Sequence, residues 1–472
     1  MQRQITLMKR SLLLLSLLYA GSLTSSAQMQ LNLPLLSSWS NPSIPPATYG
    51  AYNDCWGYVD ANGREYAIAG SSKGTHFIDI TNPAAPVEIS FQPTKDPNTL
   101  SIHRDFKTYQ HYAYGVTDQG DNSLQIFDLQ YLPDSVVKVY DSNVLTKRCH
   151  NIHIEGDKLY LASNTVGNGF NAMDVVSLAN PTQPVLLSSL NSPNFSHVHD
   201  VFVRNDTAYC SVGYDGLYVY YYGNPTTPQF LMSLTSYPEQ GYNHSSWMKP
   251  GTMDLVMADE THGSGLKIID LSDFGNPVVK SIFRSNLLNV PAPTSQNGSI
   301  VHNPFVKGNY AFLAYYHDGV QVFDISDPTA PTSYAYYDTH PQSTDYSSYK
   351  GCWGVYPFLP SGNIIASDMN NGLFIFDGSA LTGIENPEVK NSALNIYPNP
   401  FRDQITLTVP AETNHSLDVV IRDITGRMVY SGNFVADNKN SVTISTEDLS
   451  AGAYSVTASW NGGQTARKII KW

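Results

Sequence analysis

Residues 77–86 read Phe-Ile-Asp-Ile-Thr-Asn-Pro-Ala-Ala-Pro, and residues 322–331 repeat the pattern as Val-Phe-Asp-Ile-Ser-Asp-Pro-Thr-Ala-Pro. Each stretch contains an apolar strand that ends in Asp, a turn with two prolines and the start of another strand. Looser copies recur roughly every 50 residues, which leaves room for the four short strands of a propeller blade. The marked positions are Asp79, Asp128, Ser177, Tyr221, Asp270, Asp324 and Asp377.

A second column of residues lies upstream of the first and sets the number of copies. It consists of one Trp or His in each copy: Trp56, His103, His150, His197, His244, His302 and Trp353. Seven copies that share both columns predict an all-β fold, a seven-bladed β-propeller. The repeated Asp is expected to be structural, because a carboxylate at a strand end can accept hydrogen bonds from backbone N–H groups of the following turn.

The two ends of the repeat region predict how the ring closes. The last copy stops near Phe376 and has no fourth strand, whereas the segment 34–39 resembles the outer strand at 184–190. We therefore expect residues 33–39 to complete the seventh blade, which leaves only short, protected strand edges.

Three further segments flank the propeller. Residues 1–27 have the basic start, short apolar run and small-residue end of a signal peptide. The propeller is predicted over 28–381 and a polar linker over 382–393. Residues 394–472 alternate apolar and polar positions between turns and predict a small antiparallel β-sandwich.

The motifs of this last segment resemble the C-terminal sorting domain of the type IX secretion system of Bacteroidetes. They are Tyr397-Pro-Asn-Pro400, Asp423-Ile-Thr-Gly-Arg427, Leu449-Ser-Ala-Gly-Ala-Tyr454 and the basic end Arg467-Lys-Ile-Ile-Lys471. The resemblance implies export through the secretion machinery and contact with its sortase. It also implies removal of the tail, and either release to the extracellular space or attachment to the outer cell surface.

The propeller resembles the choice-of-anchor B family, whose members carry LVIVD repeats and interchangeable C-terminal anchors. The similar motifs are Tyr52-Asn-Asp-Cys-Trp-Gly57, His150-Asn-Ile152, His199-Asp200, His302-Asn303 and Trp353-Gly-Val-Tyr-Pro-Phe358. This resemblance implies the architecture and brings no enzymatic activity with it.

Composition limits the classes of partner. The chain carries a net charge of −13, and charged residues make up only 14% of it. This balance argues against nucleic acid or an anionic membrane surface as the main partner. The sequence has no P-loop and no dinucleotide fingerprint. Apart from residues 1–27, no segment of the sequence is apolar enough for a membrane span, so none is expected in the mature protein.

The second column contains the candidate site. Five of the 13 histidines fall in it, namely His103, His150, His197, His244 and His302. If the column lies on the innermost strands and faces inward, these imidazoles meet at the channel mouth and can hold a divalent metal. Strand alternation places Asp105 beside His103 and His199 beside His197, and it turns His153 away.

Two interpretations of this column remain open. In the structural one, each imidazole forms a hydrogen bond within its blade and needs no ligand. In the other, the histidines bind metal, and Trp56 and Trp353 either pack or form an aromatic wall for a sugar. Cys55, Cys149 and Cys352 precede the column. A Cys55–Cys352 disulfide is conceivable, although buried thiols are favoured.

The leading hypothesis is a non-enzymatic binding module that presents one face to a protein or glycan. The alternative is a metal-dependent extracellular lyase or hydrolase that acts on polysaccharide at a histidine-lined channel, with Asp105 as a base.

Overall fold

The chain forms two compact units, residues 1–378 and 379–472. The computed structural model describes residues 29–285, 287, 298–342, 346–381, 395–399, 401–408, 416–423, 428–435, 441–460 and 463–472. The predicted signal peptide and linker lie outside these residues. All regular elements in the described part of the chain are strands. No helix within it is long and apolar enough to cross a membrane.

The described residues of the first unit form seven antiparallel sheets, one for each copy of the repeat. The first three sheets follow the chain order. They are β3–β6 (Tyr52–Val59, Glu65–Ser71, Gly74–Asp79, Val87–Pro93), β7–β10 (Arg104–Tyr109, Tyr112–Thr117, Leu124–Asp128, Val137–Ser142) and β11–β14 (Asn151–Glu155, Lys158–Val166, Gly169–Ser177, Val185–Leu190).

The remaining four sheets include the closure of the ring. They are β15–β18 (Asp200–Arg204, Thr207–Ser211, Leu217–Tyr221, Gln229–Leu234), β19–β22 (Asn243–Met248, Asp254–Asp259, Leu266–Asp270, Val278–Phe283), β23–β26 (Pro304–Lys307, Tyr310–Ala314, Val320–Asp324, Thr332–Tyr337) and β27–β29 (Cys352–Tyr356, Asn363–Asp368, Gly372–Asp377) with β2 (Leu35–Trp39). Strand β2 pairs antiparallel with β29, so an N-terminal strand completes the last sheet as predicted.

One strand was not predicted. Residues Gln30–Leu31 form β1, which pairs with β26 and makes that sheet five-stranded. The N-terminal segment therefore adds a strand to two successive sheets.

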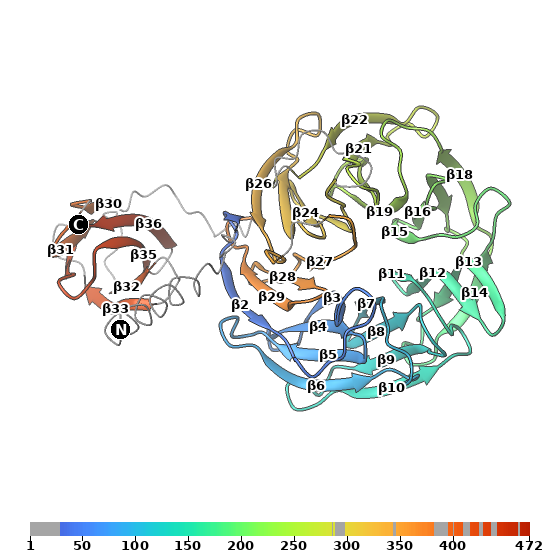
Figure 1. The fold of residues 1–472 in the computed structure, drawn as a ribbon, viewed down its shortest axis with the longest axis horizontal. Helices are drawn as coiled ribbons and strands as arrows, with labels where there is room; N and C mark the ends of the chain where they lie inside the picture. Colours follow the sequence, from blue (N-terminus) through green and yellow to red (C-terminus); the bar gives the residue numbers. More distant parts are fainter. Residues whose placement is uncertain are drawn as a thin grey trace, which may run out of the picture. The chain divides into compact units, whose positions relative to one another are not determined.

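The first strand of each sheet lies toward the centre of the ring, and the last strand lies at the rim (Figure 1). Successive first strands contact one another from β3 round to β23, and β27 contacts β3. Because the seven first strands converge, the residues at their starts meet around one axis.

The repeated Asp and the prolines after it explain the turns that follow the third strands. The Asp79 carboxylate accepts a 2.9 Å hydrogen bond from the Thr81 N–H, and Asp324 does the same with Ser326 at 2.8 Å. The structural role expected for the repeated Asp is therefore confirmed at these turns. The proline turns also join neighbouring sheets, since the Ser188 hydroxyl donates to the Pro225 carbonyl at 2.6 Å.

The core lies between neighbouring sheets. Tyr66 and Phe77 of the first sheet pack with Phe106 and Phe127 of the second, and all four side chains are buried. The four cysteines are buried free thiols. In the second unit, a three-stranded sheet is formed by β30 (Asn395–Tyr397), β31 (Gln404–Thr408) and β34 (Ser441–Ser445).

A four-stranded sheet completes the second unit. It consists of β33 (Met428–Val435), β32 (Ser416–Asp423), β35 (Gly452–Trp460) and β36 (Gly463–Lys471). Apolar residues of both sheets, among them Ile405, Ile444, Val419 and Val456, form one buried cluster. This is the sandwich-like arrangement predicted for the tail.

Candidate functional site

Six side chains form a closed circle at one end of the central channel. Successive ring centroids lie between 3.9 and 5.3 Å apart. We call this circle the histidine ring, and its members are His103, His150, His199, His244, His302 and Trp353. Three of the histidines (His103, His150 and His199) stand directly before a first strand, His302 stands two residues before β23, and His244 is the second residue of β19.

His197 was predicted in this ring and does not belong to it. Its ring lies 6.3 Å from that of His199, centroid to centroid. Its Nε2 forms a 2.7 Å hydrogen bond with the Tyr242 hydroxyl, and its Nδ1 contacts the Ser196 hydroxyl at 2.8 Å. The even spacing pointed to residue 197, but the loop before β15 (Asp200–Arg204) delivers residue 199 to the axis. The pair His-Asn or His-Asp identifies three ring residues, His150, His199 and His302, whereas His103 and His244 lack it.

Trp56 also lies elsewhere. Its ring packs 4.8 Å from Tyr356 and 6.1 Å from Phe305, and the Lys107 ammonium lies 4.4 Å from its centroid. It belongs to a second circle further along the axis, which we call the aromatic layer. The aromatic layer consists of Trp56, His153, Phe202, Trp247, Phe305 and Tyr356.

His153 was expected to point away from the channel, and it does not. It lines an axial cavity and packs against Phe202, with ring centroids 5.5 Å apart. The alternation rule failed here because His150 stands in a bend before β11 (Asn151–Glu155) and is not a strand residue. Burial lowers the pKa of His153 to about 3, so this side chain is neutral.

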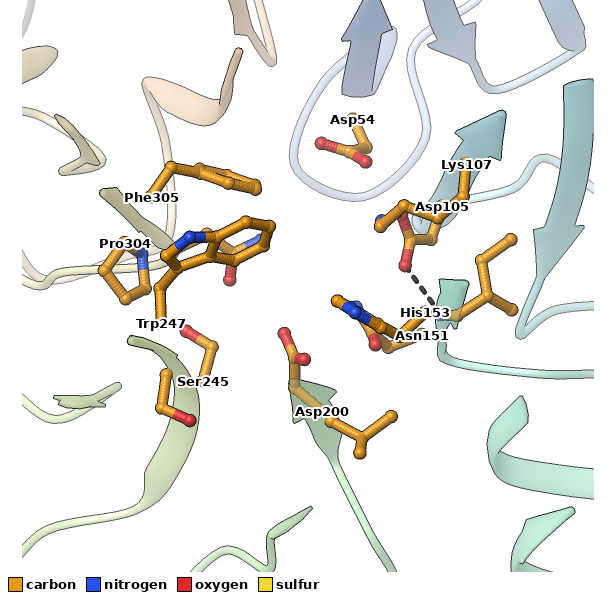
Figure 2. A pocket seen from close by; sticks show the side chains of 14 residues that line it. Asp54, Asp105, Lys107, Asn151, His153, Asp200, Ser245, Trp247, Pro304 and Phe305 are labelled. Carbon is orange, nitrogen blue, oxygen red and sulfur yellow. Dashed lines mark hydrogen bonds and ion pairs between the residues drawn. The ribbon is translucent and has the colours of Figure 1, made fainter. Parts of the chain in front are cut away.

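Asp105 does not line the histidine end. Its oxygens accept hydrogen bonds from the Lys107 ammonium, the Phe106 N–H and the Ile152 N–H, each at 2.7 Å. Asp54, Asp105 and Asp200 line one small cavity together with His153, Trp247 and Phe305 of the aromatic layer (Figure 2). We call the three Asp carboxylates and Lys107 the polar layer. The cavity there is about 20 Å³, room for a single water. An acidic side chain that is already fully bonded is a poor candidate for a base.

Charge in this polar layer is strongly reduced. Burial and the neighbouring charge of Asp105 raise the pKa of Asp54 well above its usual range. Burial, with Asp105 second, raises the pKa of Asp200 to about 7. Asp54 and Asp200 are therefore partly protonated beside Lys107, which reduces the free-energy cost of burying them.

The histidine ring differs because the Nδ1 edge is fixed in four of its five imidazoles, all except His103. The Nδ1 atoms of His150, His199 and His302 contact the Asp118 carboxylate at 2.8 Å, the His244 carbonyl at 3.2 Å and the Trp353 carbonyl at 2.6 Å, respectively. His244 Nδ1 lies 3.2 Å from the Ser245 hydroxyl.

Most of these imidazoles are neutral. Burial, followed by the charge of neighbouring histidines, lowers the pKa of His103, His199 and His244 well below the usual value. His150 is the exception. Burial alone would lower its pKa, but the hydrogen bond and charge of Asp118 outweigh this effect and raise it.

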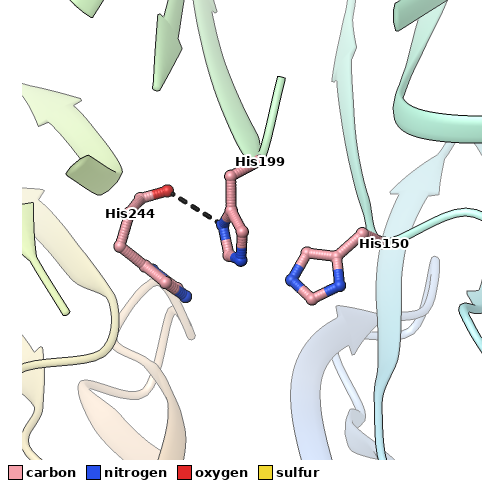
Figure 3. A group of neighbouring side chains, drawn as sticks. All are labelled: His150, His199 and His244. Atoms are coloured by element: carbon pink, nitrogen blue, oxygen red, sulfur yellow. Dashed lines mark hydrogen bonds between the residues drawn. The ribbon is translucent and has the colours of Figure 1, made fainter. Parts of the chain in front are cut away.

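Three overlapping groups of side chains can hold a metal ion. In each group, one ligand atom per residue lies within 4.8 Å of the others: His150 with His199 and His244, His103 with Asp118 and His150, and His244 with Glu260 and His302. Figure 3 shows the first group, in which ring nitrogens of the three histidines face a common space. Three imidazoles in this arrangement suit a divalent transition metal.

An open cavity of about 380 Å³ adjoins this group. Its walls are polar and aromatic, and they come from the second to the fifth sheet and the loops before them. They include Asp118, Arg148, His150, Ser163, Thr165, His197, His199 and Tyr242. The histidine end can thus accept a ligand of substantial size, whereas the polar layer cannot.

Comparisons with known proteins agree with the fold. Residues 395–472 match the family model of the secretion system C-terminal sorting domain, and residues 301–339 match the LVIVD repeat. The chain therefore contains an LVIVD repeat within its propeller unit. It carries a type IX sorting domain, which implies export to the cell surface or the extracellular space and contact with the secretion system.

This is the architecture that the resemblance to the choice-of-anchor B family implied. Among solved structures, the computationally designed Ika8 protein is similar with a TM-score of 0.45 and 11% identity, and the match covers 73% of this chain and 99% of that one. None of the curated proteins matches this chain.

Proposed function

We propose that this exported propeller is a binding module that takes a protein or glycan ligand in the cavity at its histidine end. The observation that carries the proposal is the open, polar cavity of about 380 Å³ beside the histidine ring. Cavities of this size, with a few convergent polar groups, are typical of specific ligand sites.

The cavity wall offers suitable contacts for such a ligand. Tyr242 presents an aromatic ring, and its hydroxyl is fixed by His197 Nε2 at 2.7 Å. Arg148 is exposed at the same cavity and can pair with an anionic group. The propeller holds these side chains on rigid sheets, so little ordering is required on binding.

The tail gives this module its destination. We propose that the sortase of the secretion system removes the sorting domain, and that the propeller is then released or attached to the outer surface. Mass spectrometry of the exported protein tests this. A mature chain that still contains residues 395–472 contradicts the proposal.

Binding can be tested with an array of polysaccharides and extracellular proteins probed with the full-length chain. We expect Tyr242→Ala and Arg148→Ala to weaken binding by about tenfold or more, as expected when central contacts are truncated. Tyr131→Ala is the control, because Tyr131 is half-exposed on the turn after β9, at the opposite end of the strands. Binding that is lost in Tyr131→Ala and retained in the other two variants places the ligand elsewhere.

A second function is favoured by the histidine cluster itself, namely metal-dependent cleavage of polysaccharide as a lyase or hydrolase. A metal ion next to an open cavity can polarise a substrate oxygen or activate water. New reducing ends formed from a polysaccharide, in a reaction stopped by chelator and restored by metal, would support this function. If the protein binds a polysaccharide and does not cleave it, the binding function stands and the enzymatic one is contradicted.

A further inference from the structure

We propose that His150, His199 and His244 bind one divalent transition metal ion, with zinc as the model ion, at the floor of the open cavity. The three residues come from three successive copies of the repeat. This inference deepens the proposed function, because the ion would contact a ligand that occupies the cavity. It replaces the ring predicted from spacing, which contained His197, with a compact group of three.

The orientation of the rings carries the inference. Each Nδ1 has a fixed partner, so each ring presents its Nε2 to the neighbouring rings (Figure 3). The partners are a carboxylate, a backbone carbonyl and a hydroxyl. Partners of the first two kinds orient metal-bound histidines in known sites. A structural histidine needs only one such bond and gives no reason for three Nε2 atoms to converge.

The spacing of the ligand atoms is also suitable. They lie within 4.8 Å of one another without any ion between them. Tetrahedral zinc with bonds of about 2.0–2.1 Å needs nitrogens roughly 3.3 Å apart, which small rotations of the imidazoles achieve. Three neutral ligands leave a fourth position open, the arrangement of zinc sites that bind water or substrate.

The two competing groups are weaker choices. Asp118 already forms a hydrogen bond with His150 Nδ1, so it orients a metal-binding side chain and does not itself bind the ion. Glu260 accepts a hydrogen bond from the Tyr316 hydroxyl, so one of its two oxygens is already engaged. The group of His150, His199 and His244 contributes two histidines to the wall of the open cavity, whereas the group with His103 contributes His150 and the already bonded Asp118.

The test is zinc titration of the full-length chain, purified without chelator or a metal-affinity column. We expect one zinc per chain. His150→Ala, His199→Ala and His244→Ala should each weaken binding by at least the roughly 100-fold that marks the upper end for outer-shell partners. His197→Ala is the matched control, since its imidazole lies in the same cavity but is bonded to Tyr242. It should retain zinc within about threefold.

Several results overturn the inference. One is a wild-type chain that binds no zinc; another is equal loss in His197→Ala and His199→Ala. A third is loss in His244→Ala and His302→Ala with none in His150→Ala, which assigns the ion to the group with Glu260. If an alanine variant does not fold, His199→Gln and the zinc-dependent rise in Tm of the wild type replace it. If the three histidine variants lose zinc and keep glycan binding, the metal site stands and its contact with the ligand is contradicted. If Tyr242→Ala loses glycan binding and keeps zinc, the cavity is supported independently of the metal.

Discussion

The two ends of the central channel are built from the same strand starts and have opposite properties. At the histidine end, neutral imidazoles converge beside a cavity of about 380 Å³. A few residues further along the same strands, the polar layer and the aromatic layer enclose about 20 Å³. One end has room for a ligand, and the other is packed. The position of a residue along the axis, more than its type, therefore decides its role. His153 packs among aromatic rings, whereas His150 presents Nε2 to the space beside the open cavity.

The largest effect should come from the packed end. Trp247 contacts Phe202 and Phe305 at centroid distances of 4.8 and 4.9 Å. We expect Trp247→Ala to lower the free energy of unfolding by about 3 kcal/mol, because it leaves a cavity among aromatic rings. Denaturant unfolding measures this loss, and zinc affinity should stay unchanged. If Trp247→Ala keeps its stability and loses zinc, the assignment of packing to this end and of metal binding to the other is contradicted.

Acid should also act on the packed end through His153. An unfolded histidine binds a proton below pH 6.5, whereas folded His153 does so only near pH 3. Its contribution to stability is therefore complete above pH 6.5 and is lost as the pH falls from 6.5 toward 3. His153→Phe should reduce the slope of unfolding free energy against pH in this window by up to about 1.4 kcal/mol per unit. An unchanged slope between pH 4 and 6 means that His153 is not buried as a neutral group.

A smaller effect is expected from the orienting carboxylate of the histidine end. Asp118→Asn should weaken zinc binding by about tenfold, because His150 loses its oriented partner. Zinc titration measures the change, and an affinity equal to that of the wild type would contradict the assignment.

The smallest effect should come from the rim, far from both ends. Ser188→Ala removes the 2.6 Å hydrogen bond to the Pro225 carbonyl that joins two neighbouring sheets. We expect a loss of about 1 kcal/mol in unfolding free energy and no change at the channel. A thermal unfolding curve that is unchanged would show that the proline turns hold the sheets without this bond.

The sequence predicted the repeat because strand ends and turns are local features. Asp79 with its turn, and the N-terminal strand Leu35–Trp39 that completes the last sheet, follow from patterns of a few residues. The site required distances between copies. Loops of unequal length shift the register, so His199 reaches the axis where spacing pointed to His197. Trp56 and Asp105 belong to other layers for the same reason.

The convergence of Nε2 atoms could not be predicted from the sequence either. It depends on ring rotation, which Asp118 and the His244 carbonyl set from elements far away in the chain. The pair of a histidine with a following Asn or Asp, seen at His150, His199 and His302, was the one available local signal.

The most direct test is anomalous X-ray scattering, at the zinc absorption edge, from crystals of the protein grown with zinc. Our account predicts one strong peak per chain, within bonding distance of about 2.0–2.1 Å of the Nε2 atoms of His150, His199 and His244. A peak in the polar layer around Asp105, a peak at His197, or a histidine ring without any peak would contradict it.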